Sequence, residues 1–207
     1  KLKGPAEDFG AKAILPGLVD THVHVNEPGR TEWEGFETAT RAAAAGGITT
    51  IVDMPLNSDP VTTTVNALRL KREAAKPQLS VDCAFWGGLV RGNLFQLKPM
   101  VQEGVRGFKC FLVHSGIDEF PAVTEQTLRA AMPMLRELKV PLLFHAELDC
   151  GAKSGGDPRN YRTYLESRPK GWENAAVELV VKLALKTRCR AHIVHLSSAE
   201  ALPLIAD

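Results

Sequence analysis

Several features of common protein classes are missing from this sequence of 207 residues. Its four cysteines contain no Cys-x-x-Cys pair, which argues against a disulfide framework or a zinc knuckle and favours reduced thiols in the cytoplasm. The 25 lysine and arginine residues nearly equal the 24 acidic residues, so the basic excess of a nucleic-acid-binding protein is absent. No apolar run reaches the ~20 residues of a membrane-spanning helix, and residues 1–10 do not resemble a signal peptide. We therefore expect a soluble, cytoplasmic protein without nucleic-acid or membrane partners.

The sequence does contain a regular alternation of short apolar runs with stretches of helical composition. Hydrophobic residues make up 44% of the chain, which is more than a disordered protein contains. The apolar runs are rich in Val, Ile and Phe, as strands buried on both faces are. They cover residues 18–23, 48–54, 79–86, 105–113, 140–145 and 191–196, and the helical stretches cover residues 36–45, 62–75, 124–138 and 173–186.

This alternation predicts parallel strands joined by crossover helices. An open doubly wound sheet and a (β/α)8 barrel both fit the pattern, but no Gly-rich nucleotide-binding motif follows the first strand, which weakens the first alternative. A barrel needs eight units and ~250 residues. We therefore expect an α/β fold in which residues 16–207 form about the first six units of a truncated TIM-type barrel. Residues 1–15 are expected to be the end of a small N-terminal β segment.

Histidines collect at the ends of the expected strands, where β/α barrels place their active sites. His22 and His24 are two residues apart on one strand, so both imidazoles face the same side. They could grip one metal ion, or they could be two hydrogen-bonded histidines of the core. His145 ends another apolar run. His192 and His195 are three residues apart and face opposite sides, so the spacing does not decide which of them points inward.

Lys109 is unusual because bulky apolar residues flank it on an expected buried strand. A buried ammonium group is unfavourable unless it is paired or neutral. The lysine could pair with a carboxylate, extend to the rim, act as a Schiff base, or react with carbon dioxide to form an anionic carbamate. A carbamate could bridge two cations, and imidazoles with an oxygen ligand are typical of a catalytic site for zinc or a related divalent metal.

Four motifs together resemble the amidohydrolase superfamily in its cyclic-amidase branch, and within it the allantoinases. They are Gly17-Leu-Val-Asp-Thr-His22-Val-His24, Gly107-Phe-Lys109-Cys-Phe, Phe144-His145-Ala-Glu and His192-Ile-Val-His195-Leu-Ser-Ser. The stretches Asn26-Glu-Pro-Gly-Arg, Asp53-Met-Pro-Leu-Asn57 and Ser167-Arg168-Pro169 support the narrower group.

The resemblance implies hydrolysis of a cyclic ureide, with allantoin opened to allantoate by water activated between two divalent metal ions. It assigns His22 and His24 to one ion, His145 and His195 to the other, and a carboxylated Lys109 to both. The ions would be zinc, with cobalt, iron or manganese as alternatives, and carbon dioxide would supply the carbamate. The catalytic residue, a proton-shuttling aspartate, is expected beyond residue 207, so none lies in this chain.

The resemblance also implies substrate contacts for Asn26, Asn57 and His114, although surface polarity explains these residues equally well. It further implies a homo-oligomer, a tetramer in the full-length protein. Two other functions remain open at this point. A dihydropyrimidinase or hydantoinase would share all the metal motifs, and a non-catalytic scaffold would keep the barrel without the reaction.

Overall fold

A computed structural model describes residue 4 and residues 7–151, 155–157 and 159–206 of the chain. Its strands are β1 (Leu18–Val23), β2 (Ile48–Asp53), β3 (Asp82–Phe85), β4 (Gly87–Gly88), β5 (Phe108–Phe111), β6 (Leu142–His145) and β7 (Ala191–Ile193). Its helices are α1 (Phe36–Ala45), α2 (Val65–Ala75), α3 (Leu94–Gln102), α4 (Glu125–Glu137), α5 (Tyr161–Ser167), α6 (Lys170–Thr187) and α7 (Leu202–Ala206), with a 3-10 turn at Ala199–Ala201.

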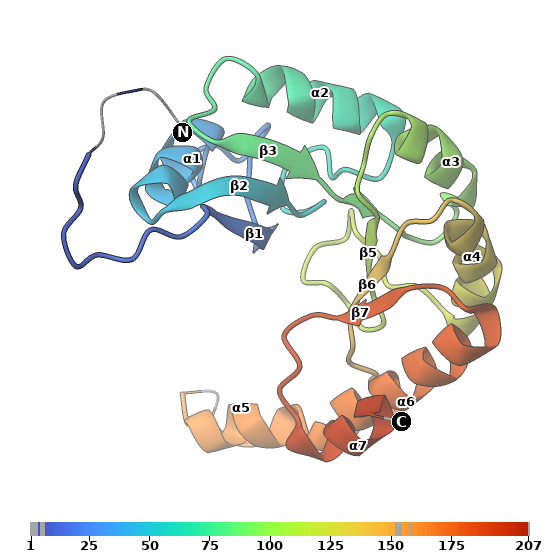
Figure 1. Cartoon of the computed structure of the whole chain (residues 1–207). Helices are drawn as coiled ribbons and strands as arrows, with labels where there is room; N and C mark the ends of the chain where they lie inside the picture. The colour runs from blue at the N-terminus through green and yellow to red at the C-terminus, as the bar shows by residue number, and fades with distance from the viewer. Residues whose placement is uncertain (1–3, 5–6, 152–154, 158, 207) are drawn as a thin grey trace.

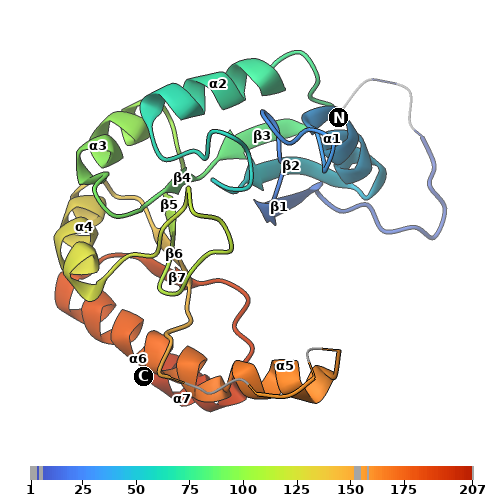
Figure 2. The same ribbon diagram turned by 180° about the vertical axis from the view of Figure 1, so that it is seen from behind.

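The strands form two parallel sheets that follow the chain in order. The first sheet has the order β1-β2-β3 and the second β4-β5-β6-β7, and every neighbouring pair is parallel. Figure 1 shows the strands along the inside of an arc, with α2, α3, α4 and α6 on its outer side, and the reverse view in Figure 2 agrees. The expected alternation of parallel strands and helices is therefore confirmed as an α/β fold.

The third expected run, residues 79–86, contains β3, and β4 follows directly after it where the two sheets meet. The Trp86 backbone N–H donates to the Asp53 carbonyl at 2.9 Å, whereas that of Gly87 donates to the Gly107 carbonyl at 2.9 Å. The chain therefore changes partner from β2 to β5 within one residue. Gly87 permits the close approach to β5, because a Cβ at this position would lie 2.7 Å from the Phe108 ring.

Local sequence signals explain several helix boundaries. The Thr64 and Thr124 hydroxyls accept hydrogen bonds from backbone N–H groups in the first turns of α2 and α4, which is the preferred way to begin a helix. Helix α1 ends at Ala45, as the expected helical stretch 36–45 does, with Gly46 as its C-cap and Gly47 following at a φ of 81°. Helix α3 was not expected, because Pro99 lies inside it and interrupts the helical pattern.

Most of the core lies on the two sides of the second sheet, and a smaller cluster packs Phe36 of α1 against Ile51 of β2 in the first sheet. One cluster packs α2, α3, α4 and α6 against the outer side of the strands, with Leu97, Phe108, Leu128, Phe144 and Leu183 completely buried. A second cluster lines the inner side and includes Trp86, Phe111 and Leu143. This inner layer supports the polar residues at the carboxyl ends of the strands.

Two further expectations concern the ends and surface of the chain. Residues 7–15 contain a turn at Gly10 and Ala11 but no strand, and residues 1–3 and 5–6 lie outside the described residues. The small N-terminal β segment therefore stays a prediction. Within the described part of the chain, no helix combines the length and apolar character needed to cross a membrane.

Candidate metal centre

The first two predicted ligands are held at the end of β1. The Asp20 carboxylate accepts a hydrogen bond from the His22 backbone N–H at 3.0 Å, and the ring centroids of His22 and His24 are 5.4 Å apart. His24 Nδ1 lies 2.8 Å from the Leu56 carbonyl, so its Nε2 is left for another partner. Burial, assisted by the nearby charge of Lys109, lowers the pKa of His22 to about 4. The ring is therefore neutral near pH 7 and keeps a lone pair for a metal.

Lys109 occupies the middle of β5, all four residues of which are buried. The residue is 1% exposed, which contradicts the interpretation that it extends to solvent at the rim. Among the described residues, no carboxylate lies within ion-pair distance of its amine, and Nζ is 5.3 Å from the Phe111 ring centroid. Desolvation lowers the pKa of Lys109 to about 8. The neutral fraction of this amine near pH 7 is therefore larger than that of an exposed lysine, and only a neutral amine can react with carbon dioxide.

The other two predicted ligands follow β6 and β7. The His145 ring stacks on Phe111 with centroids 4.7 Å apart and lies 4.9 Å from the His195 ring. The centroid of the His195 ring is 5.5 Å from that of His22. His195 therefore lies next to both His22 of β1 and His145 of β6. Burial lowers the pKa of His195 to about 4. Strand spacing left open which of His192 and His195 points inward, and these ring contacts favour His195. Among the described residues, no ring contact joins His192 to the other histidines.

The four imidazoles share Lys109 as a neighbour. Its positive charge contributes to the lowered pKa of each of them, His22, His24, His145 and His195. In the described part of the chain, no three His, Cys, Asp or Glu side chains are grouped tightly enough to hold a metal by themselves. The donor set fits divalent ions once Lys109 becomes an oxygen ligand, because imidazole nitrogen and carboxylate-like oxygen are the ligands of catalytic zinc.

The three predicted substrate residues, Asn26, Asn57 and His114, make no hydrogen bond to the four histidines or Lys109 among the described residues. Asn26 is 8% exposed, and its side-chain oxygen has no hydrogen-bond partner there. The Asn57 carbonyl accepts a bond from the Arg30 guanidinium, and the His114 ring contacts Asp118 on the surface. Their substrate roles stay predictions.

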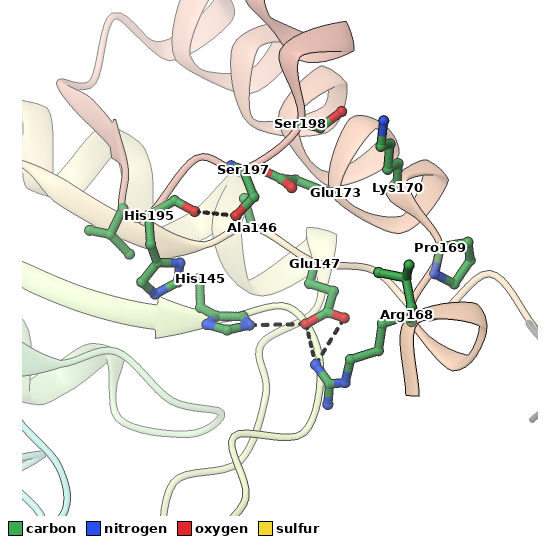
Figure 3. A pocket seen from close by; sticks show the side chains of 12 residues that line it. His145, Ala146, Glu147, Arg168, Pro169, Lys170, Glu173, His195, Ser197 and Ser198 are labelled. Atoms are coloured by element: carbon green, nitrogen blue, oxygen red, sulfur yellow. Dashed lines mark hydrogen bonds and ion pairs between the residues drawn. The ribbon is translucent and has the colours of Figure 1, made fainter. Parts of the chain in front are cut away.

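A pocket of about 370 Å³ opens beside the second pair of histidines. Its lining includes His145, Glu147, Arg168, Glu173, His195 and Ser198. Figure 3 shows Glu147 between the His145 ring and the Arg168 guanidinium. Glu147 and Arg168 both lie within the sequence motifs, but the motifs assigned them no function. Their separation of 21 residues left no periodic signal that could pair them.

Fold and site together define a class: an α/β protein of parallel strand–helix units with a histidine-rich centre at the carboxyl ends of its strands. The sequence pattern of the Amidohydrolase family matches residues 13–207, and the chain belongs to this family.

Curated relatives agree with this assignment. The chain is 54% identical to the mitochondrial allantoinase of Aquarana catesbeiana over 96% of this chain and 41% of the relative. It is 51% identical to the allantoinase of Streptomyces avermitilis over 97% of this chain and 45% of the relative. The chain thus spans less than half the length of these relatives.

Solved structures show the same fold in longer proteins. The L-hydantoinase of Arthrobacter aurescens superposes with a TM-score of 0.85 and 32% identity, covering 92% of this chain and 44% of that one. The dihydropyrimidinase of Brevibacillus agri superposes with a TM-score of 0.74 and 28% identity, covering 93% and 43%. The described fold therefore corresponds to part of a larger domain.

Proposed function

We propose that this chain is the metal-binding part of an enzyme that hydrolyses the cyclic amide of allantoin to allantoate. The observation that carries the proposal is the identity of 54% and 51% to allantoinases over nearly the whole chain. The site supports it, because four imidazoles and a desolvated lysine surround one centre. Since the chain covers less than half of these relatives, the activity belongs to the whole protein that contains it.

The fold supports a truncated (β/α)8 barrel as the framework of this site. The strands β1, β2, β3 with β4, β5, β6 and β7 supply six consecutive positions, counting β3 and β4 as one. The superposition on 44% of the L-hydantoinase chain agrees with such a partial domain. In a complete barrel all strand ends would surround the histidine cluster.

His22, His24, His145 and His195 would hold two divalent ions, and a carboxylated Lys109 would contact both. Zinc suits these ligands, with cobalt, iron and manganese as alternatives. Such ions lower the pKa of water to about 7 and polarise an amide carbonyl, as hydrolysis of an unactivated amide requires.

The chain's own residues prepare this centre. Burial keeps the imidazoles unprotonated, so their nitrogens are free to bind. The apolar surroundings of Lys109 favour its neutral amine, the form that carbon dioxide modifies. The proton-shuttling aspartate that the family resemblance implies is expected beyond residue 207, so proton transfer to the leaving nitrogen is not assigned to a residue here.

Substrate selection is proposed for Asn26, Asn57 and His114. Asn26 has the clearest physical basis, because its buried oxygen lacks a partner among the described residues and could accept a bond from a ureide N–H. A neutral amide also suits a substrate without a carboxylate.

A substrate panel tests the proposed function. The full natural protein would be loaded with zinc or cobalt in bicarbonate and offered allantoin, hydantoin, dihydrouracil and dihydroorotate, with a chelated sample as the control. We expect allantoate to form fastest. Faster turnover of hydantoin or dihydrouracil would favour the second candidate, a hydantoinase or dihydropyrimidinase, which the superposition at a TM-score of 0.85 supports. No turnover of any of the four by protein that holds two metal ions would point to a different cyclic amide as the substrate. Protein that neither holds metal ions nor turns over any of them would favour the scaffold interpretation.

Cytoplasmic location and a homotetramer are part of the proposal. The Aquarana catesbeiana relative carries the word mitochondrial in its name, so cell fractionation is the measurement that separates the two compartments. Analytical ultracentrifugation of the full protein measures the oligomeric state.

A further inference from the structure

The His145 imidazole is held on three sides. Its face stacks on Phe111 at an interplanar angle of 15°, and its edge meets the His195 ring at 68°. Its Nε2 lies 3.0 Å from the Glu147 carboxylate. These contacts define both the plane of the ring and the direction of one nitrogen.

Glu147 is itself fixed by Arg168. The Arg168 guanidinium nitrogen Nη1 lies 2.9 Å from Oε1 and 2.7 Å from Oε2 of Glu147. The Glu147 side chain is only 14% exposed and that of Arg168 45%, so the pair is partly withdrawn from solvent. Charge-assisted bonds of this length are among the stronger hydrogen bonds in proteins.

The backbone around this pair is also anchored. The Leu148 N–H donates to the Trp172 carbonyl in the first turn of α6 at 3.1 Å. Arg168 lies between α5 and α6. The first turn of α6 therefore holds the segment after β6 through one backbone bond, and the α5–α6 junction holds it through one ion pair.

We propose that Glu147 and Arg168 are positioning residues that set the tautomer and direction of the His145 ring, leaving its Nδ1 to bind the second metal ion. The inference rests on the proposed function, because it gives His145 a metal to bind.

The chemistry of imidazole carries the argument. A neutral imidazole has one N–H donor and one acceptor nitrogen. Glu147 accepts the Nε2–H, so Nδ1 retains the lone pair. Metal-binding histidines commonly donate their other N–H to a carboxylate in this way, and loss of such a partner typically weakens metal affinity about 10–100-fold. Arg168 prevents the carboxylate from rotating away from the ring.

A purely structural role for this ion pair would give a different result. A pair that only fastens the α5–α6 junction would change stability and would affect both metal sites together. A pair that orients His145 changes the site of His145 and His195 and leaves the site of His22 and His24 intact.

The test is a cobalt(II) titration of the full natural protein followed by visible absorption, which reports the affinity of each ion. The variants are Glu147→Ala, Glu147→Gln and Arg168→Met. The matched control is Arg129→Met, which breaks an ion pair with Glu125 on the exposed surface of α4 at a similar exposure of 43%. Urea unfolding of each variant measures folding separately.

We expect Glu147→Ala to lower the affinity for one of the two cobalt ions about 10–100-fold. The affinity for the other ion should stay within about threefold of the wild type. Arg168→Met should weaken the same ion by less, and Glu147→Gln should restore most of the affinity, since its amide oxygen can accept the same N–H. Arg129→Met should bind both ions as the wild type does.

If Glu147→Ala bound each of the two ions as tightly as the wild type does, the inference would be overturned while the proposed function stands. Equal weakening of both ions, or no recovery in Glu147→Gln, would also overturn it in favour of a structural role. Failure of the wild type to bind cobalt or hydrolyse a cyclic amide would overturn the proposed function and this inference with it.

Discussion

At the scale of single residues, the centre depends on desolvation. Four imidazoles and one amine lie close together, and the Glu147 carboxylate contacts one of the rings, that of His145. The arrangement is tolerable because burial lowers the pKa of His22 and His195 to about 4, so these rings carry no charge near pH 7. An unprotonated imidazole keeps the lone pair that a divalent ion requires.

The pair His192 and His195 offers the sharpest substitution test at this scale. We expect His195→Asn to remove one bound metal ion and to lower kcat/KM at least about a hundredfold, because a direct ligand is lost. His192→Asn should stay within about threefold of the wild type, since among the described residues only His195 of the two makes ring contacts with the other histidines. Metal analysis and steady-state kinetics of both variants measure these effects. Loss of the ion in His192→Asn instead would reverse the assignment.

At the scale of elements, a buried ion pair ties α2 to the ends of β1 and β2. Lys71 Nζ lies 2.6 Å from the Asp53 carboxylate and 3.2 Å from the Met54 carbonyl, and both side chains are at most 1% exposed. The other Asp53 oxygen accepts the Val25 backbone N–H at 2.7 Å, directly after His24. Burial raises the pKa of Asp53, and the charge of Lys71 opposes that rise. The pair therefore holds the strand that carries two predicted ligands.

Lys71→Met should lower the free energy of unfolding by about 3–5 kcal/mol, because the Asp53 carboxylate is left buried without its partner. Urea denaturation measures this change. The double variant with Asp53→Asn should recover a large part of it, since the asparagine oxygen can still accept the Val25 N–H. Lys98→Met, on the exposed side of α3, is the matched control and should be near neutral. A Lys71→Met protein as stable as the control would contradict this account.

The sequence predicted the elements better than the contacts between them. Runs rich in Val, Ile and Phe located all the described strands except β4, which lies just beyond the run 79–86. The helical stretch expected from residue 62 begins three residues later, at Val65, and the stretch expected from residue 124 begins at Glu125 after the Thr124 cap. Helix α3 was missed because a proline inside a short helix removes the expected signal. Lys71 lies in a helical stretch of the sequence, where a lysine is ordinarily on the surface. Only the fold shows that its side chain is buried against Asp53.

The candidate site shows the same limit. Strand spacing brought His22 and His24 to one face, but it could not choose between His192 and His195. That choice depends on how β7 enters the structure, where His195 has a φ of 42° and its ring reaches His22. The association of Glu147 with Arg168 depends on the path of the chain between β6 and α6, which no local pattern encodes.

At the scale of the whole molecule, the arc of strands has a free edge at each end. Among the described residues β1 pairs with β2 alone and β7 with β6 alone. Leu18 and Val19 on β1 are 60% and 59% exposed. Native proteins pair or cover such edges, so we expect this surface to be covered in the full natural protein.

The most direct test of the central claim is anomalous diffraction at the zinc edge from crystals of the full natural protein grown with zinc and bicarbonate. The account predicts two zinc peaks, one contacting His22 and His24 and the other contacting His145 and His195, with continuous density from Lys109 to both. No peak at these histidines, or an unmodified Lys109 beside a single peak, would contradict it.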